Sequence, residues 1–233
     1  MAAHSNIVGG STAKRVINCP GSVALVQQVP PKPSSSYADE GTLLHNTIAA
    51  ILETGKKPED FLGTFYNGVE LTEDRLERKL LPALAALDEI DPEGKLEYAV
   101  EQVVGFGDVL PGVFGSADLV GRIGNRGILL DWKFGDGVAV EAEENPQALF
   151  YTAAALRTEA TRWAFEGVDE VEVMDNLWAG FAGLNAHIVI AAGWTAAASR
   201  GFAPAPDVLG VMFATLFVTL LAYGALKVRR RLG

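Results

Sequence analysis

One turn sequence constrains the fold of this chain more than any other segment. Residues 124–127 read Gly-Asn-Arg-Gly, between an apolar run that ends at Ile123 and another that begins at Ile128. Short apolar runs on both sides of such a turn are typical of a β-hairpin. We expect the chain to fold back about Asn125-Arg126.

Charged side chains gather at the open end of this hairpin. The fold-back brings Asp118 opposite Asp131–Lys133, to within one residue of register. Because side chains alternate across a strand, Asp131 and Lys133 share one face and Trp132 lies on the other. Two close carboxylates repel each other unless a cation such as Mg²⁺ lies between them. An ordinary hairpin with solvated charges is the less favoured alternative, because both charged sets fall at the same end.

The arrangement resembles that of the PD-(D/E)XK nuclease superfamily, whose core hairpin supplies an Asp and then a D/E-x-K triplet. Three further segments are similar to motifs of its RecB-type branch, which includes phage exonucleases. They are Gly41–His45 (G-x-x-x-H), Gln147–Tyr151 (Q-x-x-x-Y) and the N-terminal Cys19–Ser22. The resemblance covers roughly residues 5–174, with the motifs in family order.

The resemblance implies a metal-dependent DNA nuclease, an exonuclease of phage recombination, repair or DNA end processing. The implied catalytic residues are Asp118, Asp131 and Lys133. The implied ligands of Mg²⁺ or Mn²⁺ are His45, Asp118, Asp131 and the backbone carbonyl of Trp132. An imidazole ligand favours Mn²⁺ over Mg²⁺.

The outer motifs also have plainer interpretations. Spacing alone favours His45 as a core histidine, and only the motif context reverses that preference. Gln147 and Tyr151 are expected to bind substrate or to support the site, while simple packing of Tyr151 is nearly as favoured. Glu101 is a further acidic candidate, but its favoured interpretation is a solvated residue on a strand around 96–104.

Capping residues predict where the helices begin and end in the sequence. The helix that carries His45 should span 38–53 and end at Gly55, and the helix that carries Gln147 should start at Asn145-Pro146. Thr72 should open another helix, which Pro82 bends. With strands over 96–133 and 168–174, these helices predict an α/β fold with a restriction-endonuclease-like core, a short mixed sheet flanked by helices.

Charge argues against strong nonspecific DNA binding. The chain carries a formal charge of -10; five basic and two acidic residues give 175–233 a charge of +3, which leaves -13 on residues 1–174. We therefore expect a modest, salt-dependent affinity for phosphates. Either a narrow positive groove formed by Lys133, Arg122, Arg126 and the metal admits DNA, or a recombination partner protein supplies the grip.

Cysteine content excludes one cofactor. Cys19 is the single cysteine, so one chain cannot hold an iron–sulfur cluster or an internal disulfide. Residues 1–10 lack the apolar core of a secretory signal. Both features indicate a cytoplasmic nuclease domain.

The last 59 residues differ from the rest. Residues 208–226 are uncharged and are followed by Lys-Val-Arg-Arg-Arg, a pattern typical of a membrane helix that ends in the cytoplasm. Residues 177–199 form a second uncharged run, for which a buried helix is as favoured as a membrane span. Residues 175–233 are thus expected to form an apolar helical hairpin or a single helix that tethers domain 1–174 to the inner membrane, through a native anchor or a gene fusion.

Three functional hypotheses remain open. The favoured one is the Mg²⁺- or Mn²⁺-dependent DNA nuclease. The alternatives are a catalytically weak DNA-binding or scaffold protein and a membrane-anchored interaction protein. The lysine at position 133 favours the enzyme, because a binding module does not need it at that spacing.

Overall fold

A computed structural model of the chain describes residues 5, 7–30, 32–134, 145–177 and 186–191. The elements before the central sheet are α1 (Gly10–Asn18), α2 (Ser22–Gln27), α3 (Ser36–Thr54), η1 (Pro58–Phe61), β1 (Phe65–Tyr66), β2 (Val69–Glu70), α4 (Glu73–Arg75), η2 (Leu76–Leu80) and α5 (Leu81–Ile90). Those that follow are β3 (Glu97–Gly105), η3 (Gly107–Val109), β4 (Phe114–Ile123), β5 (Arg126–Trp132), α6 (Pro146–Arg157), α7 (Glu159–Arg162), β6 (Glu170–Leu177) and β7 (Ala186–Ala191).

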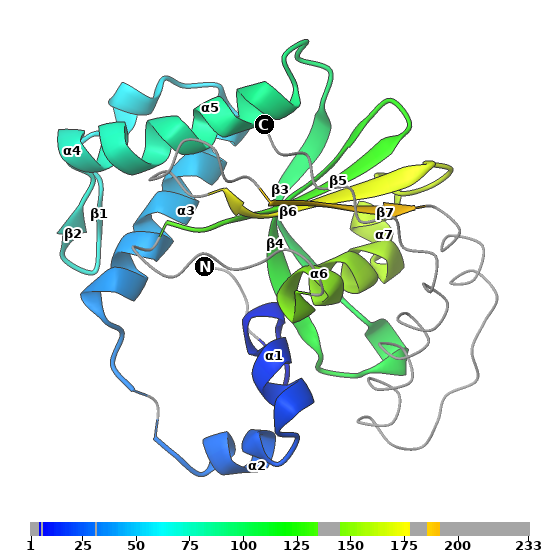
Figure 1. The fold of residues 1–233 in the computed structure, drawn as a ribbon. Helices are drawn as coiled ribbons and strands as arrows, with labels where there is room; N and C mark the ends of the chain where they lie inside the picture. The colour runs from blue at the N-terminus through cyan, green and yellow to red at the C-terminus, as the bar shows by residue number, and fades with distance from the viewer. Residues whose placement is uncertain (1–4, 6, 31, 135–144, 178–185, 192–233) are drawn as a thin grey trace.

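A mixed sheet forms the centre of the molecule (Figure 1). Its strand order is β3-β4-β5-β6-β7. All neighbours are antiparallel except β5 and β6, which are parallel and are connected through α6 and α7. The predicted α/β class, a mixed sheet flanked by helices, is confirmed.

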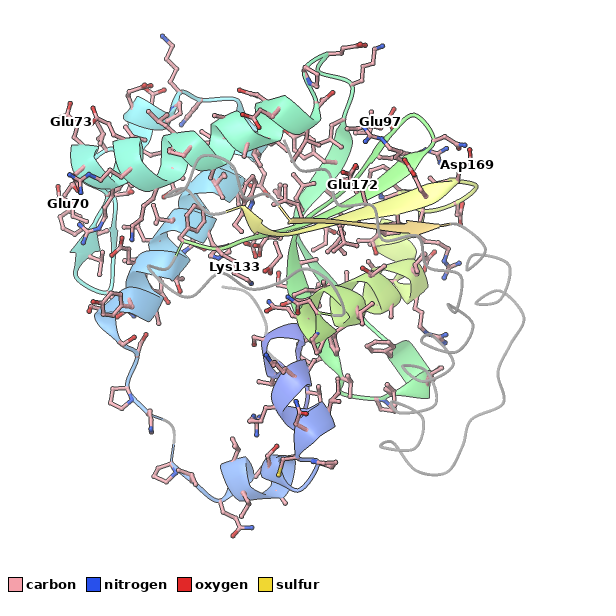
Figure 2. The ribbon with its side chains drawn as sticks, in the orientation of Figure 1. Glu70, Glu73, Glu97, Lys133, Asp169 and Glu172 are labelled. Carbon is pink, nitrogen blue, oxygen red and sulfur yellow. The ribbon has the colours of Figure 1, made fainter. Side chains whose placement is uncertain are left out.

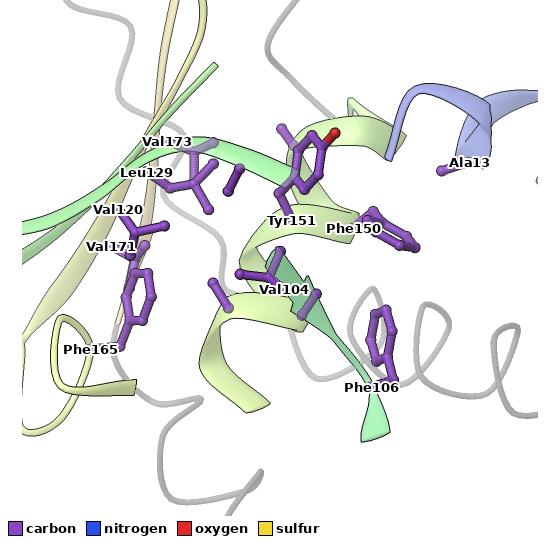
Figure 3. Close-up of a cluster of buried hydrophobic side chains, with 14 of the residues drawn as sticks. Ala13, Val104, Phe106, Val120, Leu129, Phe150, Tyr151, Phe165, Val171 and Val173 are labelled. Carbon is purple, nitrogen blue, oxygen red and sulfur yellow. The ribbon is translucent and has the colours of Figure 1, made fainter. Parts of the chain in front are cut away.

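Helices cover both faces of the sheet and bury two apolar cores. The α6-side core, drawn in Figure 3, joins the sheet to α1, α6 and α7, and includes Val104, Ala117, Leu129, Ala154 and Phe165. The α3-side core joins the other face to α3, η2 and α5, and includes Leu44, Ile48, Leu80, Leu119 and Leu130. Because both faces are covered, side chains of both orientations are buried along most of β4 and β5.

The predicted helix caps are confirmed. Gly55 ends α3 in the left-handed conformation with φ 65°, and the Asn145 side chain accepts a hydrogen bond from the backbone N–H of Gln147 at the start of α6. Thr72 caps α4. The predicted bend at Pro82 takes the form of one turn of π-helix, η2, directly before α5. Because proline has no N–H to donate, the ordinary helical register is interrupted at this point.

The turn of the β4–β5 hairpin lies one residue earlier than predicted. Ile123 pairs with Arg126, so the two turn residues are Gly124 and Asn125 rather than Asn125 and Arg126. Gly124 has φ 56°, a conformation that costs glycine little. The same register places Asp118 directly opposite Asp131.

Three predictions concern the C-terminal part of the chain. Residues 186–191, expected to be helical within the run 177–199, form β7, because their backbone pairs with β6. The domain boundary expected at residue 174 falls inside β6. No helix within the described residues has the length and apolar character to cross a membrane. The predicted span 208–226 lies outside those residues.

Candidate functional site

Helix α3 places His45 against the sheet. Its buried neighbours Leu44 and Ile48 fix the helix on the α3-side core, so His45 projects from the edge of that apolar surface. The His45 Nδ1 atom lies 3.3 Å from Asp118 Oδ2, and the edge of the ring meets Phe134 at a centroid distance of 5.1 Å. The predicted approach of His45 to Asp118 is therefore present.

Asp118 lies on β4, and the neighbouring strand β5 holds its side chain in place. The Asp118 side chain is buried, and its Oδ2 atom accepts a 2.6 Å hydrogen bond from the backbone N–H of Trp132. The indole of Trp132 is buried in the α3-side core. The hairpin thus fixes the carboxylate through its own backbone.

Glu101 is the residue that sequence reasoning placed wrongly. It was expected to be a solvated strand residue, but it is half-buried and stands opposite Asp118 at the level where the β3–β4 pairing is interrupted. Its φ of 49° is unusual for a residue with a side chain. Such strained backbone persists only where the surroundings enforce it.

At this level, the side chains of β3 and β4 change the face of the sheet on which they lie. Val100 and Leu119 belong to the α3-side core, whereas Val104 and Ala117 belong to the α6-side core. In a regular strand, residues two or four apart share a face. The irregular backbone at Glu101, opposite Asp118, therefore moves the side chains that follow it to the opposite face in both strands. No sequence pattern marks this change of face, because it depends on how β3 and β4 pair.

His45, Glu101 and Asp118 together form a candidate metal centre. One possible ligand atom from each, an imidazole nitrogen and two carboxylate oxygens, lies within 4.8 Å of the other two. This donor set suits Mn²⁺ and, through its carboxylates, Mg²⁺. The centre shares His45 and Asp118 with the predicted ligand set and adds Glu101, whereas Asp131 makes an ion pair with Lys133.

Crowding of acids shifts the pKa values at this centre. Burial raises the pKa of Glu101 above its usual 4.5, and the charge of Asp118 raises it further. Burial acts to lower the pKa of His45, but the charge of Asp118, a hydrogen bond with it and the charge of Glu101 together raise that pKa above 6.5. The charge of Asp118 contributes to both shifts, and a cation between the acids would relieve their repulsion.

Asp131 and Lys133 form the second half of the site. The Lys133 ammonium makes an ion pair with the Asp131 carboxylate, as expected for residues on one face of the strand. Gln147 of α6 donates from Nε2 to Asp131 Oδ1 at 3.2 Å. The backbone carbonyl of Trp132 follows Asp131 in the chain, and the amide of the same residue binds Asp118, so the two halves are contiguous.

Tyr151 packs next to the site, in the α6-side core. It is buried in the α6-side core, as Figure 3 shows, one helical turn after Gln147. Its ring lies so close to the backbone of Gly10 and Gly115 that a Cβ atom on either glycine would come within 3 Å of it. Gly115 begins the segment that leads to Asp118, so Tyr151 packs against the strand that carries this aspartate.

The predicted positive groove is not formed. Arg126 makes an ion pair with Glu172, and Arg122 donates to the carbonyl of Glu166, both at the turn end of the hairpin. Lys133 follows the far end of β5, seven residues and about 20 Å away at 3.3 Å per residue. Figure 2 shows Lys133 and Glu172 well apart. Lys133 therefore has no support from these two arginines.

A comparison with protein-family models gives one match, to the family described as "Protein of unknown function (DUF2800)". The match covers residues 4–173, more than half of the 233-residue chain. The matched range includes His45, Glu101, Asp118, Asp131, Lys133 and Gln147, and it ends within β6.

Proposed function

We propose that this chain, which belongs to the DUF2800 family, is a metal-dependent nuclease that hydrolyses phosphodiester bonds at DNA ends. The observation that carries the proposal is the convergence of His45, Glu101 and Asp118 beside the Asp131–Lys133 pair. The mixed sheet flanked by helices is the architecture that a PD-(D/E)XK resemblance implies, and it supports a restriction-endonuclease-like core.

The residues present suit a divalent ion. His45, Glu101 and Asp118 would hold Mn²⁺ or Mg²⁺, with Asp131 and the Trp132 carbonyl as further oxygen donors at the same edge of the hairpin. When bound, such an ion polarises a phosphodiester and offsets the charge that develops on its oxygens.

We assign to Lys133 the role of orienting the attacking water. Its ammonium is partly exposed, so it can reach solvent while it remains paired with Asp131. In that position it would orient the water and favour its deprotonated form. Gln147 holds the Asp131 carboxylate, which in turn directs the ammonium. The lysine at this spacing favours an enzyme over a DNA-binding module, which does not need it.

The negative charge of the chain indicates that a second protein contributes to DNA binding. Residues 1–174 carry -13, and Arg122 and Arg126 are engaged away from the site. We therefore propose that a recombination partner supplies part of the grip on DNA. The isolated protein should then bind DNA weakly, and its cleavage should fall only modestly as salt rises, because few phosphate contacts release few counterions.

Incubation of linear and circular DNA with the purified chain tests the function. We expect Mn²⁺ to support loss of the linear form, Mg²⁺ to support it more weakly and EDTA to abolish it. An Asp118→Asn variant prepared in parallel controls for contaminating nucleases. Binding of DNA without cleavage under every metal condition would refute the nuclease and favour the scaffold alternative.

A further inference from the structure

Ser116 contacts the candidate metal centre without belonging to it. It lies on β4, two residues before Asp118, and its side chain is buried. Its Oγ atom donates to Glu101 Oε2 at 3.0 Å, diagonally across the β3–β4 pair. A hydroxyl in a buried strand position is retained at a cost unless it is hydrogen-bonded, and this one is bonded to the acid of the centre.

Glu101 needs such a partner to remain in place. Its backbone is strained, with φ 49°, and its carboxylate faces that of Asp118. Repulsion between the two acids favours a rotation of the Glu101 side chain away from Asp118. The Ser116 hydroxyl opposes this rotation, because a hydrogen bond to a charged acceptor is stronger than one between neutral groups.

We infer that Ser116 is a positioning residue that holds the Glu101 carboxylate toward the ion shared with His45 and Asp118. The inference rests on the proposed function, since it concerns the ion of that same site. It also gives a reason for the Ser in the sequence Gly115-Ser116-Ala117-Asp118, where alternation alone would allow any small residue. Partners that orient metal ligands typically contribute about 10- to 100-fold to metal affinity.

The test is calorimetric titration of Mn²⁺ into the DNA-free protein, so that cleavage is not the readout. The variants are Ser116→Ala, Glu101→Gln and the double variant. Thr152→Val is the matched control, because Thr152 is also buried but donates only to the carbonyl of Ala148 within α6. Thermal unfolding without metal checks that each variant is folded.

We expect Ser116→Ala to weaken Mn²⁺ binding about 10- to 100-fold, with Thr152→Val unchanged. Glu101→Gln should also weaken binding, and adding Ser116→Ala to it should cause no further loss, because the serine acts through the glutamate. Equal affinity of Ser116→Ala and the unmodified chain would overturn the inference. So would a full additional loss in the double variant. If the unmodified chain does not bind Mn²⁺, the proposed function fails as well, and this result is distinct from the other two.

Discussion

His45 and Asp118 meet where α3 packs on the sheet, with Nδ1 of the histidine 3.3 Å from Oδ2 of the aspartate. The same Oδ2 atom accepts a hydrogen bond from the backbone of Trp132 on the neighbouring strand. One carboxylate oxygen thus links the β4–β5 hairpin to helix α3, which lies far earlier in the chain. The relationship fixes the candidate metal centre to the rigid core rather than to a loop, which is where a precise site is best supported.

Replacing Asp118 by Asn should separate its electrostatic role from its structural one. The amide oxygen still accepts from the Trp132 backbone, so the fold should persist, but the charge that attracts the ion is lost. Because a bound metal supplies several kcal/mol to the transition state, we expect cleavage to fall about 100-fold or more. The measurement is the initial rate of digestion of linear DNA in Mn²⁺, alongside the melting temperature. Wild-type activity in this variant would remove Asp118 from the site.

The stability conferred by His45 should depend on pH. Its pKa is raised above 6.5 in the folded chain, so its favourable contribution is fully present below pH 6.5 and is lost as pH rises through the folded pKa. In metal-free protein, His45→Asn should therefore lower the free energy of unfolding more at pH 5.5–6 than at pH 9. Urea unfolding at the two pH values measures the difference. An equal loss at both would mean that the histidine is not held by Asp118.

Glu101→Gln should stabilise the metal-free chain. The pKa of Glu101 is raised by burial and by Asp118, so the stability that this acid contributes is fully present below its usual 4.5 and is lost as pH rises through the folded pKa. Removing the charge at pH 7.5 should raise the melting temperature without metal and reduce the increase that Mn²⁺ produces. Glu97→Gln, at an exposed position of the same strand, serves as the control. A lower melting temperature for metal-free Glu101→Gln would contradict the proposed crowding of acids.

Lys133→Met should reduce cleavage while sparing metal binding. The ammonium makes its ion pair with Asp131 and lies outside the group His45, Glu101 and Asp118. Loss of a group that directs a proton transfer typically costs about 10²- to 10⁴-fold in rate. Mn²⁺ affinity should stay equal or rise slightly, because a neighbouring positive charge is removed. Parallel assays of digestion and Mn²⁺ titration distinguish this outcome from a joint loss of both, which would place Lys133 in a structural role.

Gly115→Ala should destabilise the chain through a steric effect. A Cβ atom at this position would lie 2.9 Å from Cε1 of Tyr151, inside the α6-side core. Overpacking of this kind costs about 1–3 kcal/mol. Gly41→Ala is the matched control, because no atom lies within 4 Å of its added Cβ and the helical site favours alanine by roughly 1 kcal/mol. Urea unfolding should show opposite signs for the two substitutions; a neutral Gly115→Ala would mean that Tyr151 yields easily.

Local sequence determined the hairpin, the helix ends near the site and half of the candidate site. Turn and capping residues predicted the β4–β5 hairpin, the start of α6 at Asn145-Pro146 and the end of α3 at Gly55, because these signals act within a few residues of backbone. Strand alternation likewise predicted that Asp131 and Lys133 share a face. Only the tertiary structure decided that Glu101 joins His45 and Asp118, that Arg122 and Arg126 lie far from Lys133, and that residues 186–191 extend the sheet. These outcomes depend on how strands pair and twist across long separations in the chain, and the energies that govern such pairing come from neighbours that a local pattern does not contain.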